Sequence, residues 1–321
     1  MKILHLFWNP KEKRLRALVR LVIFAFLFLF LTIISLLLFS SFSGIQGLMQ
    51  SIWLSSLIEV FVTLISVLLS SIIIDRRHPA KLGLIFSKTW WKDFGFGIFL
   101  GAFLMSVIFL TELALGWVEI SGFFGINSPV PTILTEDAFP GQFLGALAIF
   151  ISVGIYEELL VRGYLMKNLA EWFNHPSIRP EIALIYSTVI ASAIFGLLHS
   201  ANPNSSAFST IYLSLAGIFL SLGVLLDGSL AIPIGLHISW NLFQGSVFGF
   251  PVSGMPAPAS LIQINHSGPD FMTGGAFGPE AGLVGLTALA LGSFLTLLWY
   301  RKTLGEVCIH SDFARYQFKK D

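Results

Sequence analysis

Long apolar runs recur along this chain, and they constrain its fold more than any other feature. Eight segments have about the 20 residues that a helix needs to cross the hydrocarbon core of a bilayer. They are 17–40, 51–74, 94–117, 142–170, 182–200, 207–226, 229–250 and 280–300. A bilayer offers no hydrogen-bond partners to an open backbone, so such segments are expected to be helices. The sequence therefore predicts an all-α fold, a polytopic membrane helical bundle of about eight transmembrane helices.

Composition supports this prediction and excludes other classes of protein. Charged residues make up 12% of the 321 residues and hydrophobic residues 55%, with a mean hydropathy of +0.81. A soluble domain has roughly 25% charged residues, and a disordered chain has low hydrophobicity, so neither class fits. The net charge of +1 implies no nucleic-acid partner. The single cysteine, Cys308, excludes an intrachain disulfide and a cysteine-cluster metal site.

The distribution of Lys and Arg predicts the orientation of the spans. The first apolar run, 21–39, is longer than the apolar region of a signal peptide and no small-residue cleavage pattern follows it, so it is expected to be a retained span. With the N-terminus inside and alternating spans, eighteen of the 19 basic residues fall in inner segments and none in outer loops. Basic residues gather on the cytoplasmic side of membrane proteins. We therefore expect a multi-pass protein of the cell inner or plasma membrane with both termini cytoplasmic.

Two segments between the spans, and one span itself, are rich in proline and glycine. The segments 118–141 and 251–279 are polar and are predicted to be loops. The seventh span, 229–250, is interrupted by Pro233, Gly235 and Gly245. Such residues are tolerated in membrane helices where neighbouring groups satisfy the freed backbone.

Ionisable residues inside an apolar span point to function, because a charge at mid-bilayer costs about 2.5–3.5 kcal/mol. The fourth span carries three of them, Glu157, Glu158 and Arg162. Glu158 and Arg162 are four residues apart and can pair on one helix face. Glu157 is rotated about 100° from Glu158, so it faces a different neighbour. The alternative is that all three snorkel at the cytoplasmic boundary.

Glu59 and Glu112 are isolated acids in other spans. A helix–helix hydrogen bond is expected for Glu59. Glu112 is expected near the membrane interface. The sequence assigns neither of them a functional role.

Two histidines on later spans add to the polar set. His199 follows Phe195 by four residues in the fifth span, and His237 precedes Asn241 by four in the seventh. Either histidine alone could simply make a helix–helix hydrogen bond. Together with the acids they suit hydrolysis of an amide. A carboxylate and a neutral imidazole can hold and deprotonate a water, while a second imidazole and a carboxamide can donate to the oxyanion.

Other protease chemistries fit less well. The chain has no Gly-x-Ser-x-Gly turn and no His-Glu-x-x-His motif, and Cys308 lies outside the spans. Glu157, His199 and His237 could still ligate Zn²⁺ from three helices, with a water as the fourth ligand. The residue types do not distinguish a metal-bound water from a Glu-activated one.

The depth of His199 in its span sets a geometric condition for such a site. If the fifth span starts near Ile182, His199 lies about 26 Å along it, whereas Glu157 lies near the middle of its own span. Strong tilt or a deeper start of the fifth span is therefore expected to bring the two residues together.

Three motifs on three apolar segments resemble the CPBP family, which contains CAAX prenyl proteases, bacteriocin-processing enzymes and abortive-infection proteins. E-E-x-x-x-R is matched at 157–162, F-x-x-x-H at 195–199 and H-x-x-x-N at 237–241. The resemblance covers about 142–250. It implies three parts: N-terminal helices and loops over 1–141, a catalytic core over 142–250, and an outer loop, last helix and cytoplasmic tail over 251–321.

The resemblance also implies an activity and residue roles. Glu157 would activate water with His199, Glu158 and Arg162 would support that pair, and His237 and Asn241 would stabilise the oxyanion. The expected function is an intramembrane endopeptidase acting on a prenylated CAAX-type or other membrane-embedded peptide within the lipid bilayer. The family is described both as metalloproteases and as metal-free enzymes, so Zn²⁺ stays open as a cofactor. A membrane transporter and a non-catalytic scaffold or immunity protein are the alternatives.

Overall fold

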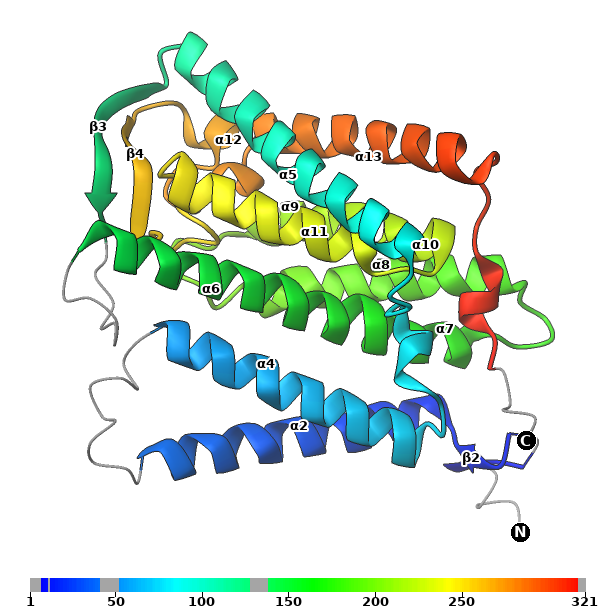
Figure 1. Cartoon of the computed structure of the whole chain (residues 1–321). Helices are drawn as coiled ribbons and strands as arrows, with labels where there is room; N and C mark the ends of the chain where they lie inside the picture. The colour runs from blue at the N-terminus through cyan, green and yellow to red at the C-terminus, as the bar shows by residue number, and fades with distance from the viewer. Residues whose placement is uncertain (1–6, 11, 41–51, 128–137, 317–321) are drawn as a thin grey trace.

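The computed structural model describes residues 7–10, 12–40, 52–127 and 138–316. The described chain is a bundle of helices with two short pairs of strands (Figure 1). The α-helices are α2 (Ala17–Ser40), α4 (Ile52–Leu69), α5 (Lys88–Ala114), α6 (Phe139–Glu158), α7 (Met166–Phe173), α8 (Pro180–Leu198), α9 (Ala207–Leu220), α10 (Leu222–Asp227), α11 (Ala231–Asn241), α12 (Asp270–Thr273) and α13 (Leu283–Leu304). π-Helical segments follow α4, α6 and α11 at Ser70–Ile74, Leu159–Leu165 and Leu242–Val247.

The described helices confirm the prediction of a multi-pass membrane bundle. Seven helical stretches are long and apolar enough to cross a bilayer. One of them is a continuous rod of 35 residues, Phe139–Phe173, formed by α6, its π-helical segment and α7. The remaining predicted span is α11 with the π-helical segment after it, and α11 alone has only 11 residues. The architecture is consistent with about eight transmembrane helices.

Helix α11 lies at the centre of the bundle, where it packs against α5, α6 and α9 (Figure 1). All of its residues are buried, as expected for a helix that is apolar on every side. Glycines allow the close approach of α5. A Cβ on Gly97 would lie 2.5 Å from the carbonyl oxygen of Ile232, and one on Gly101 would lie 2.6 Å from that of Leu236. Small residues at such contacts are typical of membrane helix packing.

Two antiparallel strands cover one end of the bundle. β3 (Val118–Ile126) pairs with β4 (Ala259–His266), with Val118 opposite His266 and Ile126 opposite Ala259. The prediction that 118–141 and 251–279 are loops is therefore wrong for these strands. β3 contains β-branched and aromatic residues and β4 contains two isoleucines, and whether such a short segment pairs as a strand depends on a distant partner strand. At the other end, β1 (Trp8–Asn9) pairs with β2 (Arg14–Leu15).

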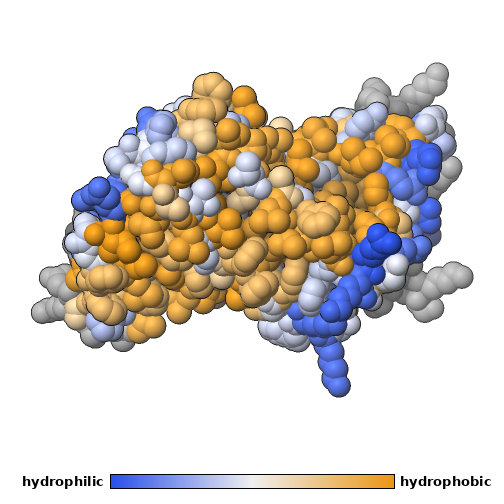
Figure 2. Space-filling view, turned by 90° about the horizontal axis from the view of Figure 1, so that it is seen from above, coloured by the Kyte–Doolittle hydropathy of each residue, from blue (hydrophilic) through white to orange (hydrophobic). Residues whose placement is uncertain are grey.

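The surface of the bundle is apolar over its middle. Figure 2 shows hydrophobic residues across the centre of this face, with hydrophilic residues toward the two ends. Large exposed side chains include Phe26 and Phe30 of α2, Phe61 of α4 and Phe99 of α5, each at least 60% exposed. A soluble protein rarely exposes so much apolar surface, whereas a bilayer covers it.

Candidate active site

A helical hairpin brings the acids and the first histidine to the same depth. The rod Phe139–Phe173 and helix α8 are antiparallel and are joined by the turn at 174–179 (Figure 1). Measured from that turn at 1.5 Å per residue, Glu157 lies about 24 Å along one arm and His199 about 28 Å along the other. Helix α8 begins at Pro180 rather than at a deeper position, and the two residues meet because they lie at similar distances from the turn. Depth along each arm is set by the shared turn.

Glu158 is the fully buried centre of the site. Its Oε1 accepts a hydrogen bond from Nη1 of Arg162 at 2.9 Å and lies 2.7 Å from Nδ1 of His237. The side chains of Glu158 and Arg162 are both 0% exposed. Arg162 also donates from Nη2 to the carbonyl oxygen of Gly217 on α9 at 3.3 Å. Glu158 thus joins its own helix to α11 through His237, and Arg162 extends the connection to α9.

Phe195 links the arginine to the second histidine. The guanidinium carbon of Arg162 lies 4.2 Å from the centre of the Phe195 ring, a cation–π distance. The ring of His199 lies 4.7 Å from the same ring, and His199 Nδ1 lies 2.8 Å from the carbonyl oxygen of Phe195. Helix α8 ends here, so its last carbonyl groups lack helical partners, and the imidazole satisfies one of them. This geometry explains the four-residue spacing of F-x-x-x-H.

Glu157 faces both imidazoles across a narrow gap. Its Oε2 lies 4.0 Å from Nε2 of His199 and 3.8 Å from Nε2 of His237. Both distances are too long for a hydrogen bond and have the length that one bridging water spans. In each histidine Nδ1 lies beside an acceptor oxygen, so Nε2 is the nitrogen presented to Glu157. The Glu157 side chain is 16% exposed, whereas that of Glu158 is fully covered.

A small cavity adjoins the two histidines. It has a volume of about 50 Å³, and its polar lining comes from His199, His237, Asn241, Ser253 and Glu280. A water needs about 10–15 Å³ of such volume, so the cavity has room for a few waters. Apolar side chains from α8, α9, α11 and α13 form the rest of the wall. The cavity thus gathers polar side chains inside an apolar bundle, and it places Asn241 beside the histidines.

Glu280 is a cavity residue for which the sequence gives no signal. Its Oε1 accepts a hydrogen bond from the backbone N–H of Ser253 at 2.6 Å, and its Oε2 contacts Nε2 of Gln244. Gln244 accepts in turn from Nε1 of Trp240 on α11 at 2.8 Å. Burial raises the pKa of Glu280 to about 7. One acid at the edge of an apolar run does not stand out in a sequence, because only folding buries it beside the motif residues.

The other isolated acids also find partners. The hydroxyl of Tyr156 lies 3.5 Å from Oε1 of Glu157 and hydrogen-bonds Glu59 of α4, which is the helix–helix bond expected for Glu59. Glu112 is buried, and its carboxylate lies 3.3 Å from Nε2 of His266 in β4. The sequence assigns no role to His266, because the partner acid is more than 150 residues away along the chain.

The residues Glu157, His199 and His237 do not form a zinc site as placed. Two ligands at about 2.0–2.1 Å from a tetrahedral zinc lie about 3.3 Å apart, which is shorter than the 3.8 and 4.0 Å measured from Glu157. Within the described residues, no group of three His, Cys, Asp or Glu side chains is placed to hold a metal ion.

Comparison with known proteins identifies the segment that carries the site. Residues 139–243 match the family described as Type II CAAX prenyl endopeptidase Rce1-like, over about a third of the chain. The matched segment contains all three motifs and so all six predicted site residues. No curated protein and no solved structure matches the chain. Residues 139–243 are therefore a CAAX-type domain of the CPBP family of intramembrane proteases.

Proposed function

We propose that this protein is an intramembrane endopeptidase that cleaves a prenylated CAAX-type peptide or another membrane-embedded peptide with a water activated by Glu157. The observation that carries the proposal is the convergence of Oε2 of Glu157 on Nε2 of His199 at 4.0 Å and on Nε2 of His237 at 3.8 Å. This oxygen has no hydrogen-bond partner among the described residues. Glu157 is the acid suited to this role, because its Oε2 has no hydrogen-bond partner among the described residues, while Oε1 of Glu158 is engaged by Arg162 and His237.

His237 is the imidazole that lies between the two carboxylates. Its Nδ1 lies 2.7 Å from Oε1 of Glu158, and its Nε2 lies 3.8 Å from Oε2 of Glu157. Glu158 therefore fixes the orientation of the ring. A hydrogen on Nε2 can donate to an oxyanion that forms beside Glu157.

The reaction follows from these positions. The water oxygen attacks the carbonyl carbon of the scissile peptide bond as Glu157, assisted by His199, accepts the water proton. The carbonyl oxygen becomes an oxyanion, which accepts hydrogen bonds from Nε2 of His237 and the carboxamide of Asn241. The C–N bond then breaks, and the proton held by Glu157 moves to the leaving nitrogen. The products are a carboxylate and a free amine.

The surroundings of the cavity indicate the class of substrate. Its apolar wall includes Leu213, Phe219, Leu220, Leu236 and Leu289. An apolar wall beside a few polar groups suits a substrate that brings its own hydrocarbon. A lipidated peptide or a membrane segment has this chemistry.

Glu157→Ala tests the proposal in the full-length protein reconstituted into nanodiscs. The substrates are a quenched fluorescent peptide ending in a prenylated CAAX sequence and a reporter with a membrane-embedded cleavage segment. We expect turnover to fall by about 10²–10⁴-fold, the usual contribution of a general base. Turnover should survive treatment with a chelator, with metal analysis confirming that the protein is metal-free.

Glu119→Ala is the matched control, because Glu119 is an exposed acid on β3. This variant should cleave like the wild type. Cleavage by Glu157→Ala at the wild-type rate would exclude Glu157 as the base. If the wild-type protein cleaves neither substrate but carries ions across vesicle membranes, the transporter alternative is favoured.

A further inference from the structure

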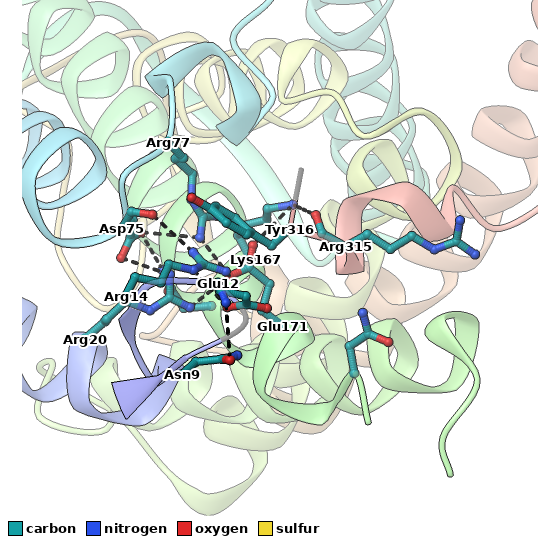
Figure 3. Close-up of polar contacts among 12 residues, drawn as sticks. Asn9, Glu12, Arg14, Arg20, Asp75, Arg77, Lys167, Glu171, Arg315 and Tyr316 are labelled. Atoms are coloured by element: carbon teal, nitrogen blue, oxygen red, sulfur yellow. Dashed lines mark hydrogen bonds and ion pairs between the residues drawn. The ribbon is translucent and has the colours of Figure 1, made fainter. Parts of the chain in front are cut away.

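A second cluster of polar side chains lies at the α7 end of the rod Phe139–Phe173. Arg14, Arg20 and Arg77 each donate from Nη2 to Oε2 of Glu171, at 2.9, 2.8 and 2.8 Å (Figure 3). Asp75 pairs with Arg20 at 3.3 Å and with Arg77 at 3.5 Å. These five side chains are at most 4% exposed. We call them the arginine cluster. It joins the start of α2, the end of α4 and helix α7.

A groove of about 210 Å³ adjoins the arginine cluster. Its lining includes Arg77, Lys81, Ile85, Lys167 and Arg315. Arg77 belongs to both features. Only its Nη2 is used by the two carboxylates. Within the part of the chain that the structure describes, Nε and Nη1 of Arg77 have no hydrogen-bond partner. A buried guanidinium with two unused donor atoms at the wall of a groove is a ready anion site.

The charges of the arginine cluster and the groove do not cancel. Among the described residues, the cluster and the groove contain six Lys and Arg side chains, Arg14, Arg20, Arg77, Lys81, Lys167 and Arg315, and four carboxylates, Asp75, Glu171, Asp227 and Asp312. Two of these acids are engaged by arginines, since Asp312 pairs with Arg315 at 3.3 Å and Glu171 pairs with the three arginines of the cluster. Basic side chains therefore outnumber acidic ones here, which favours binding of an anion such as a phosphodiester.

Apolar side chains continue from the rim of the groove onto the surface. Ile85 lines the groove and is 61% exposed, and the neighbouring Phe86 is 62% exposed. The ring of Phe86 lies 6.1 Å from that of Trp91, which is 56% exposed at the start of α5. Aromatic residues at the ends of membrane helices typically lie at the headgroup level. An anion bound in the groove would therefore have a hydrocarbon-compatible surface beside it.

We propose that this groove binds the phosphate of an anionic phospholipid, with Arg77 and Lys81 contacting the headgroup and an acyl chain covering Ile85, Phe86 and Trp91. A free phosphate would use the same basic residues but would gain nothing from the apolar rim. Basic pockets between membrane helices recognise lipid headgroups in this way. The site is separate from the proposed active site, because none of its residues lines the cavity beside His199 and His237.

Native mass spectrometry and thermal unfolding of the full-length protein in detergent test this proposal. The probes are phosphatidylglycerol, phosphatidylcholine with the same acyl chains, and inorganic phosphate. We expect phosphatidylglycerol to bind at least fivefold more tightly than phosphatidylcholine and to raise Tm. Lys81→Gln should remove most of this preference, and Ile85→Gln should weaken binding of the lipid without changing the response to phosphate.

Arg179→Gln is the matched control, because Arg179 is exposed in the turn at 174–179 and does not line the groove. It should leave lipid binding unchanged. Equal binding of the two lipids, or equal loss in Lys81→Gln and Arg179→Gln, would overturn the proposal. A Tm increase of the same size with inorganic phosphate alone would instead identify a site for a soluble anion. Arg77→Lys, which keeps the charge but not the fork of donors, should bind less tightly than the wild type.

Discussion

At the scale of single residues, the two adjacent acids of the E-E-x-x-x-R motif have different surroundings, which is why we propose different roles for them. Glu158 has no exposed surface and shares one oxygen between Arg162 and His237. Glu157 keeps some exposure and faces two imidazole nitrogens across a gap. A rotation of about 100° between neighbouring helical residues is enough to give the two carboxylates different partners.

Glu280 gives a pH-dependent prediction at this scale. Burial raises the pKa of Glu280 from an ordinary value of 4.5 to about 7. Between these pH values the folded protein keeps a proton that the unfolded chain has lost, so stability falls as the pH rises from about 4.5 to about 7. At about 1.4 kcal/mol per pH unit, the loss is at most about 3 kcal/mol. Glu280→Gln removes this contribution.

Thermal unfolding of Glu280→Gln and the wild type at pH 5 and pH 8 checks the prediction. The quantity to compare is the Tm of the variant minus the Tm of the wild type. We expect this difference to be larger at pH 8 than at pH 5, even if the substitution also changes Tm by a constant amount at both pH values. Glu119→Gln on β3 is the control, because that acid is exposed in the folded protein. A difference between variant and wild type that is the same at both pH values would contradict the raised pKa.

At the scale of the elements, the site depends on close approach between helices. Gly154 of α6 lies against Ile238 of α11, one turn before Glu157. A Cβ at Gly154 would lie 2.5 Å from Cγ1 and 3.0 Å from the backbone nitrogen of Ile238. A larger residue must therefore push α6 away from α11, and these helices hold Glu158 and His237 at 2.7 Å.

Gly154→Val should lower the cleavage rate by at least about tenfold, because a shift of about 1 Å at a catalytic contact can cost about 10²-fold in rate. The measurement is turnover of the prenylated peptide in nanodiscs, with Tm recorded for the same samples. Gly145→Val on the same helix is the matched control, since a Cβ there meets nothing within 4 Å. Equal activity of the two variants would show that the approach of α6 to α11 does not set the site geometry.

At the scale of the whole molecule, the bundle separates the proposed active site from a basic end. The C-terminal segment joins the N-terminal one at that end, where the guanidinium carbon of Arg14 lies 3.3 Å from the centre of the Tyr316 ring. Lys167 also donates to the carbonyl oxygen of Phe313. The two ends of the described chain therefore lie on the same side of the bundle, and the distribution of Lys and Arg predicts that this side is cytoplasmic.

Cys308 tests this orientation, because it is the single cysteine of the chain and is exposed. A membrane-impermeant maleimide should fail to label it in intact cells and should label it after permeabilisation. The control is a Cys308→Ser protein carrying Glu119→Cys, which places the thiol on β3 at the other end. That variant should be labelled in intact cells. Labelling of Cys308 in intact cells would reverse the predicted topology.

The sequence by itself determined the helical bundle and the identity of the polar set. Runs of about 20 apolar residues permit only helices in a bilayer, and Glu157, Glu158, Arg162, His199, His237 and Asn241 stand out because charged and polar groups are costly there. Their pairing along one helix, such as Glu158 with Arg162, also follows from spacing alone.

Only the tertiary structure decided which groups from different helices meet. The gap between Glu157 and the imidazoles, the burial of Glu280 beside them, and the pairing of β3 with β4 depend on residues far apart along the chain. The same holds for the arginine cluster, since its members read in sequence as separate basic and acidic residues near span ends. Local spacing fixes which residues share a face of one helix. Contacts between helices are fixed by packing, which no local pattern encodes.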